Sequence, residues 1–131
     1  PMTDLEDILA RSWARIEGCR VAAVAGLDGL LIERHPNPAS EPALYSGPDA
    51  EELDHVVADV TTLFGVVGGA MSKQLGAQVR ELIAIGETGG YLAKRISDDI
   101  FCLLVVGASA DLEGLRREAE AISRELSAAF V

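Results

Sequence analysis

The chain has 131 residues, of which 11 are basic and 21 acidic, so its formal net charge at neutral pH is -10. This length predicts a single domain over residues 1–131 with a sizeable core. The acidic balance argues against binding to nucleic acid, because phosphates repel a negatively charged surface. However, 49% of the residues are hydrophobic and the mean hydropathy is +0.23, which argues against disorder. We therefore expect another molecule to cover part of the apolar surface.

The N-terminal segment is predicted to form an amphipathic helix. Thr3 and Glu6 have the spacing of a capping box, in which side chains satisfy free backbone N–H groups at a helix start. Apolar residues then recur at helical spacing up to Ile16, and Gly18 is a stop signal. The segment is acidic and has no apolar signal core, so a cytoplasmic location is expected.

A β-hairpin is predicted next. Cys19–Ala25 and Leu30–Arg34 are typical of strands, and Asp28-Gly29 between them favours a tight turn with positive φ. His35–Pro48 holds four of the five prolines and is predicted to be a loop, since proline removes backbone donors. The hairpin and loop together precede a long helix.

That helix is expected to begin after Asp49, which forms a second capping-box pattern with Glu52, and to end near Gly76. Three strands of an antiparallel meander follow, and Ser109 or Asp111 then caps a final helix with one apolar stripe. The predicted strands are Gln78–Ile85, Tyr91–Ile96 and Ile100–Val106. The last of them is apolar on both faces, which is typical of a central strand that is covered on both sides. The order α-β-β-α-β-β-β-α predicts an α+β (α/β) fold with helices on both faces of the sheet.

The long helix carries two distinct faces. One is an apolar core stripe, and the other, about 120° around the axis, consists of small residues. Glycine in a helix costs about 0.5–1 kcal/mol relative to alanine, so close approach of another backbone is a physical reason for this face. The small face packs either against the chain's own sheet or third helix, or against a second copy across a two-fold axis, which we favour. Pairing of the edge strand Gln78–Ile85 with another chain would extend that interface. The predicted interface residues are Ala58, Thr61, Gly65, Gly68, Gly69 and Ser72 of the helix, with Val79, Glu81 and Ile83 of the strand.

The sequence contains few groups that could carry chemistry. It has no P-loop, no GxGxxG after a strand, no HExxH and no GxSxG. His35 and His55 are isolated from other metal-ligating residues in the sequence. Cys19 and Cys102 have no metal-type spacing, and their apolar surroundings are typical of buried thiols. We predict no catalytic, cofactor-binding or metal-binding residue, and a non-enzymatic binding module.

Four segments together resemble a known family. They are the hairpin Val21–Ile32, the helix end Leu63–Gly76 followed by Gln78–Leu82, the segment Gly89–Ile96 and the strand Ile100–Val106. Their order is similar to that of Roadblock/dynein light-chain domains, which include bacterial MglB-like proteins. The resemblance implies a profilin-like fold, with a five-stranded antiparallel sheet, the long helix on one face and the two terminal helices on the other. It also implies homodimers built by the central helix and third strand.

Members of this family act as partners of Ras-like small GTPases, and MglB-type proteins stimulate the GTPase of a polarity switch. The resemblance therefore implies a cytoplasmic homodimer that binds a small Ras-like GTPase as a regulator or scaffold and modulates its GTP hydrolysis. The sequence itself predicts no cofactor and no nucleic-acid partner. It also predicts no membrane insertion, because the longest uncharged run, Val60–Ser72, is too short and too polar to span a bilayer. Two alternatives stay open: a small-molecule sensory domain that holds its ligand between sheet and helix, and an enzyme that uses Cys19 or Cys102.

Overall fold

The fold was analysed in a computed structural model that describes residues 2–41 and 48–130. The elements follow the expected order, three helices and five strands in the sequence α-β-β-α-β-β-β-α. Their bounds are α1 Met2–Arg15, β1 Cys19–Gly26, β2 Leu31–His35, α2 Ala50–Leu75, β3 Glu81–Ile85, β4 Gly89–Arg95, β5 Ile100–Gly107 and α3 Leu112–Ala129.

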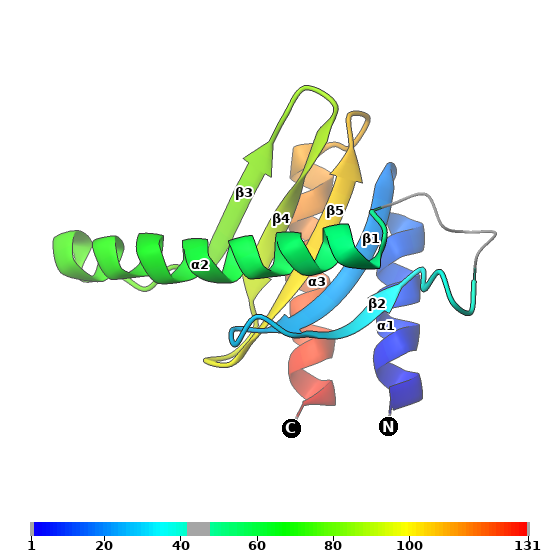
Figure 1. Ribbon diagram of the computed structural model, residues 1–131, viewed down its shortest axis with the longest axis horizontal. Coiled ribbons are helices and arrows are strands. Elements are labelled where there is room, and N and C mark those ends of the chain that lie inside the picture. Colours follow the sequence, from blue (N-terminus) through cyan, green and yellow to red (C-terminus); the bar gives the residue numbers. More distant parts are fainter. Residues whose placement is uncertain (1, 42–47, 131) are drawn as a thin grey trace.

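The five strands form one antiparallel sheet in the order β2-β1-β5-β4-β3. The strand over residues 100–107 is central, as its apolar sequence predicts, and pairs Cys102 with Val24 of β1 and with Lys94 of β4. The two edges are β2 and β3, so the prediction that the third strand lies at an edge is confirmed (Figure 1).

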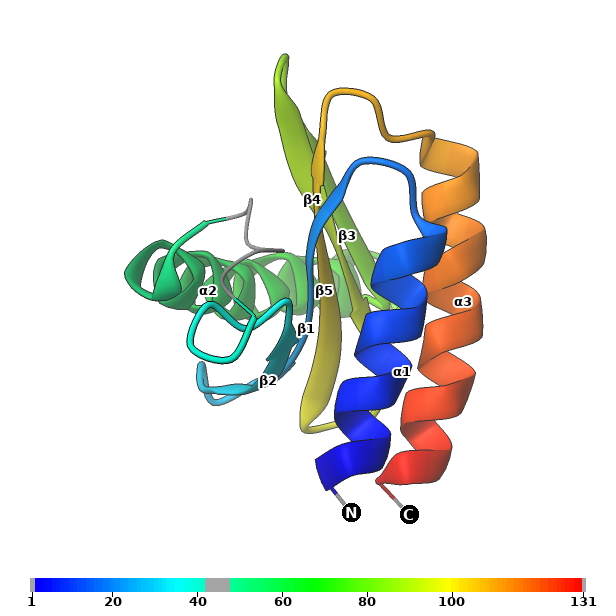
Figure 2. The same cartoon turned by 90° about the vertical axis from the view of Figure 1, so that its right-hand side faces the viewer.

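Helices cover both faces of the sheet, and each interface has its own core. The two terminal helices α1 and α3 lie side by side on one face, and α2 crosses the other face (Figure 2). The layer under α1 and α3 contains Leu9, Leu104 and Ile122, all fully buried. The layer under α2 contains Val57, Phe101 and Phe64, whose ring centroid lies 5.5 Å from that of Phe101. The layer order implied by the family resemblance is therefore confirmed.

Capping explains where α2 and α3 begin. Asp49 Oδ1 accepts a hydrogen bond from the Glu52 backbone at 2.8 Å, and the Asp49 N–H donates to Glu52 Oε1 at 3.2 Å. Asp111 caps α3 by accepting from the Gly114 backbone at 2.9 Å. The predicted capping box at Thr3 is wrong, because α1 begins at Met2 and Thr3 lies inside the helix.

The hairpin and the loop differ in detail from the prediction. Residues 27–29 form a three-residue connection in which Gly29 has a φ of +92°, and a bulge follows in the β1–β2 pairing between Val24 and Ala25. Strand β2 also extends one residue further, so His35 is a buried strand residue whose ring meets Trp13 edge-on. The predicted loop starts after it, and its residues 42–47 lie outside the described part.

Substitution of Asp49 tests the capping of α2. We expect Asp49→Ala to lower the free energy of unfolding by about 1 kcal/mol, because an N–H group at the helix start loses its partner. The measurement is urea unfolding at one fixed protein concentration. Glu51→Ala, an exposed first-turn carboxylate without a cap bond, is the matched control and should change stability less. Equal losses in both variants would contradict a specific capping role.

Candidate interaction surface on the central helix and edge strand

The first half of α2 packs on the sheet more closely than the second half does. The fully buried side chains of α2 end at Phe64, which is 4% exposed; the only later contributions to the core are the partly buried Val67 and Met71. Figure 1 shows why: α2 crosses the strands and then runs past the edge at β3. By length and composition alone, α2 could cross a membrane. The core helices of many soluble proteins meet the same two criteria.

Large apolar side chains remain exposed on this half of α2 and on the neighbouring edge strand. Val66 and Leu75 are 66% and 72% exposed on the helix, and Ile85 is 58% exposed on β3. Leu63 and Ile83 are 40% and 39% exposed. Ile83 pairs with Leu92 of the layer under α1 and α3, so Ile83 and Ile85 lie on the sheet face opposite α2. The exposed apolar groups therefore lie on both sides of the open β3 edge, and such groups are typical of a protein–protein interface. We call these five residues the apolar surface.

Among the described residues, the glycines of the small face have no close neighbour outside their own helix. A Cβ atom placed on Gly65, Gly68 or Gly69 would meet no atom within 4 Å outside the helix backbone. Packing against the chain's own sheet or third helix therefore does not explain these residues. Ala58 and Ser72 on the same face are exposed, and so is Gly69.

Helical spacing separates Leu63 and Val66 of the apolar surface from the small face of α2, whereas Leu75 lies beside that face, about 80° from Gly65. Thr61 and Gly65 line a shallow hollow of about 220 Å³ together with Leu27 and Arg95. Leu63, Val66 and Ala70 have the i, i+3, i+7 spacing of one flank, and at about 100° per residue they lie roughly 160°, 100° and 140° around the axis from Gly65. The sequence analysis did not predict this second flank. The helical spacing of Leu63, Val66 and Ala70 is the signal that could have indicated it.

The three predicted residues at β3 have different environments. Val79 precedes the strand and is buried in the layer under α2, 4% exposed. Glu81 forms an ion pair with Arg116 of α3 at 3.0 Å. Ile83 is exposed and belongs to the apolar surface. In the part of the chain that the structure describes, β3 pairs only with β4, and its other edge is open.

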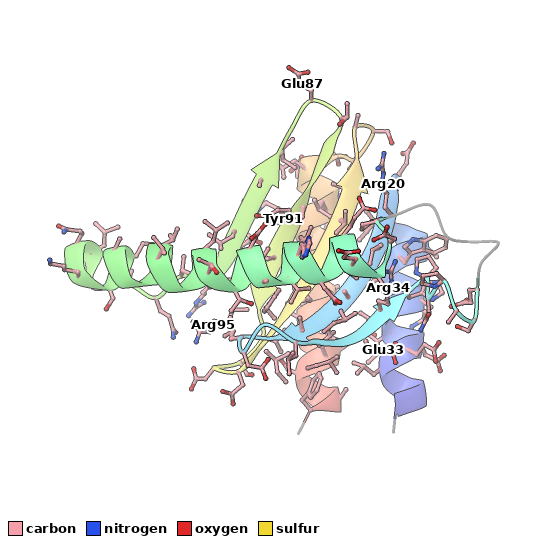
Figure 3. All side chains as sticks on the ribbon, viewed as in Figure 1. Arg20, Glu33, Arg34, Glu87, Tyr91 and Arg95 are labelled. Carbon is pink, nitrogen blue, oxygen red and sulfur yellow. The ribbon has the colours of Figure 1, made fainter. Side chains whose placement is uncertain are left out.

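One polar group borders the apolar surface. Tyr91 lies on β4 under α2 (Figure 3), where burial and the nearby negative charge of Asp59 raise the pKa of its hydroxyl. The phenol therefore stays a neutral hydrogen-bond donor at physiological pH. Such a group at the margin of an apolar surface can orient a partner without an added charge.

Both thiols are unsuited to nucleophilic catalysis. Burial raises the pKa of the Cys19 thiol to about 12 and that of Cys102 to about 11. The reactive form of cysteine is the thiolate, which is scarce at neutral pH when the pKa is so high. The buried environment predicted for both residues is confirmed, and it disfavours the cysteine-enzyme alternative.

Among residues 2–41 and 48–130, no group of three or more His, Cys, Asp and Glu side chains is placed to hold a metal ion. The space between α2 and the sheet is occupied by core side chains, including Leu53, Val60 and Phe101. The hollows that the structure describes lie at the sheet ends and edges instead. Two of these hollows include residues of α2, Thr61 and Gly65 in one and Ala50 in the other, but both lie at the margin of the sheet and not within the core that the described residues form. This arrangement disfavours the sensory-domain alternative.

Comparison with solved structures identifies the fold. The chain superposes on a Roadblock/LC7 domain from Streptomyces avermitilis with a TM-score of 0.80 at 18% identity, covering 97% of this chain and 98% of that one. The gliding protein MglB of Thermus thermophilus matches with a TM-score of 0.81 at 19% identity, covering 96% and 87%. A structure of MglB in a tetrameric arrangement matches with a TM-score of 0.80 at 17% identity, covering 97% and 87%.

No family model matches the sequence, and no curated protein does. The chain nevertheless has the roadblock fold over nearly its whole length, at identities below 20%. The fold implied by the resemblance of the sequence to this family is therefore confirmed.

Alkylation tests the environment of the thiols. At pH 8 we expect Cys19 and Cys102 to remain unmodified by iodoacetamide in the folded protein, because both pKa values lie well above this pH. Mass spectrometry of the intact chain measures the modification. The same protein in guanidinium chloride is the control and should gain two adducts. Adducts formed equally fast in the folded protein would contradict the buried environment.

Proposed function

We propose that the chain is a non-enzymatic, cytoplasmic regulator of the roadblock type that forms a homodimer and binds a Ras-like small GTPase. The observation that carries this proposal is the combination of an open β3 edge with an α2 helix whose second half leaves Leu63, Val66 and Leu75 exposed. Both features lie on the same side of the molecule (Figure 1). A second copy could cover them in one self-complementary contact.

In the proposed dimer, a two-fold axis passes near the middle of β3. The two β3 strands pair antiparallel, which satisfies the backbone groups at the open edge and joins the two sheets. The α2 helices then lie antiparallel to each other, and each covers exposed side chains of the other, including Leu63 and Val66. The likeness to MglB in a tetrameric arrangement supports self-association of this fold.

The GTPase is expected to bind to the surface that the paired α2 helices form. The likeness to MglB supports this assignment, because the family resemblance implies binding of Ras-like GTPases. The described residues offer this surface no catalytic constellation, since both thiols are buried and no metal cluster is formed. Any effect on GTP hydrolysis would therefore come from positioning groups of the GTPase itself.

The dimer proposal predicts loss of association when its surface is changed. Val66→Asp or Ile83→Asp should convert the dimer to monomers, because a carboxylate would be buried in an apolar contact. Gly65→Leu or Gly68→Leu should do the same if the small face is also in the contact, as the sequence predicts. Sedimentation velocity measures the mass.

Leu30→Asp is the matched control, because Leu30 is also 66% exposed but lies between the β1–β2 turn and the first residue of β2. It should leave the dimer intact. A native chain that sediments as a monomer at micromolar concentration would contradict the dimer. Monomers from Val66→Asp but not from Gly65→Leu would assign the contact to the apolar surface alone.

Binding of a GTPase is tested directly. We expect the native chain to bind at least one Ras-like GTPase from the same genome in one nucleotide state, measured by calorimetry with the GDP form and with a non-hydrolysable GTP analogue. The Val66→Asp variant should bind more weakly, since the paired platform is lost. Absence of binding to every such GTPase in both states would contradict the proposed function.

A further inference from the structure

Three cationic side chains surround a hollow at one end of the sheet. Arg80 lies just before β3, and Lys94 and Arg95 end β4. Together with Gln78 and Ser97 they line a hollow of about 380 Å³. This concentration of positive charge is unexpected in a chain with a net charge of -10. Arg95 extends below α2 at the lower end of the sheet in Figure 3, opposite to the end that carries Arg20.

The register of the sheet places two of these cations directly opposite each other. Glu81 pairs with Lys94 across β3 and β4, so Arg80 is opposite Arg95, and the Arg95 N–H donates to the Arg80 carbonyl oxygen at 2.8 Å. Side chains at directly opposite positions point to the same face of a sheet, with Cβ atoms about 4.5–5.5 Å apart. Like charges in such a pair repel each other. An anion bound between them would remove this repulsion.

The Arg95 guanidinium is held in place by the turn that follows it. Its Nε donates to the Ser97 carbonyl oxygen and its Nη2 to the Asp98 carbonyl oxygen, both at 3.1 Å. Neither bond neutralises the charge, and Nη1 makes no hydrogen bond in the described part of the chain. Arg80 is exposed and takes part in no ion pair among the described residues.

The third cation is already neutralised. Lys94 Nζ lies 3.1 Å from Glu120 Oε2, and the hydrogen bond from Lys94 lowers the pKa of the Glu120 carboxyl. Asp98 is the other carboxylate at the hollow, and no ion pair joins it to either arginine. The charge of Arg80 also contributes to lowering the pKa of the Glu120 carboxyl, although no ion pair joins these two side chains. The hollow therefore presents two guanidinium groups that form no direct ion pair among the described residues.

We propose that this hollow is a docking site for an acidic segment of a partner protein, with a carboxylate held between Arg80 and Arg95. Guanidinium groups match carboxylates well, because their parallel N–H donors can bind both oxygens. The site goes beyond the dimer and GTPase surfaces proposed above, since it lies at the lower end of the sheet and uses charge rather than apolar contact.

A protein segment fits this site better than a free anion does. Asp98 and Glu120 leave only a small excess of positive charge at the hollow. Salt screens exposed charges beyond about 8 Å at physiological ionic strength, so this excess alone would hold a small ion weakly. A peptide brings further contacts. The hollow also includes Ile96, and Arg95 and Asp98 border the neighbouring hollow with Leu27 and Phe64.

Fluorescence anisotropy with labelled peptides tests the proposal on the full chain. A hexaglutamate peptide should bind, with an affinity that falls as salt increases, and a hexaglutamine peptide should not. Arg80→Glu should weaken hexaglutamate binding at least about fivefold, because the charge of one partner is reversed. Arg80 makes no side-chain bond that the fold needs, and circular dichroism verifies folding of the variant.

Arg20→Glu is the matched control, because it makes the same charge change at the far end of the same sheet (Figure 3). It should leave binding unchanged. An equal loss in both variants would show a general charge effect and overturn the site. Displacement of the peptide by inorganic phosphate at an equal or lower concentration would overturn the protein-segment assignment in favour of a free-anion pocket.

A change in sedimentation mass of Arg80→Glu would mean that the site joins copies of this chain, which also overturns the proposal. Peptide binding needs no GTPase, so the outcome is independent of the function proposed above. A positive peptide result without any GTPase binding would retain the docking site and reject only that function.

Discussion

The fold depends on the burial of β1 and β5 from both sides. Ala22, Val24 and Leu104 face the α1 and α3 layer, while Val21, Ala23 and Leu103 face the α2 layer. Neighbouring residues of a strand point to opposite faces, so strands without polar positions must be covered twice. A chain of this length can meet that requirement only by assigning helices to each face. The position of every helix follows from this constraint.

The same constraint leaves half of α2 without a core. Five strands spaced about 4.8 Å apart form a sheet roughly 20–25 Å wide, whereas 26 residues at 1.5 Å each make a helix of about 39 Å. A helix that crosses the strands must then extend past one edge. Its last turns are nevertheless well formed, since Gly76 ends α2 in the left-handed conformation with a φ of 61°. A surface this regular and this apolar is suited to contact another protein.

Local patterns in the sequence predicted most of the fold. The Asp49 cap, the Asp111 cap and the doubly covered strand at Ile100 each depend on residues within a few positions of one another. Thr3 was misassigned because capping-box spacing alone does not show where helical hydrogen bonding begins. The exposure of the apolar flank at Val66 and the Arg80–Arg95 pair could not be predicted from such local patterns. Each depends on which elements are neighbours in space and in what register, and that information arises only when the sheet is assembled.

Charge along α2 bears on how two copies would orient. The carboxylates of α2 lie in its first ten residues, ending at Asp59, and its one Lys or Arg side chain is Lys73 near the other end. Antiparallel helices would point the Lys73 end of each α2 toward the half of the other α2 that carries its carboxylates. Parallel helices would bring like charges and aligned helix dipoles together instead. Burial of apolar side chains favours contact but does not depend on the relative direction of the two helices. These few charges would therefore favour the antiparallel arrangement, which β3 pairing also requires.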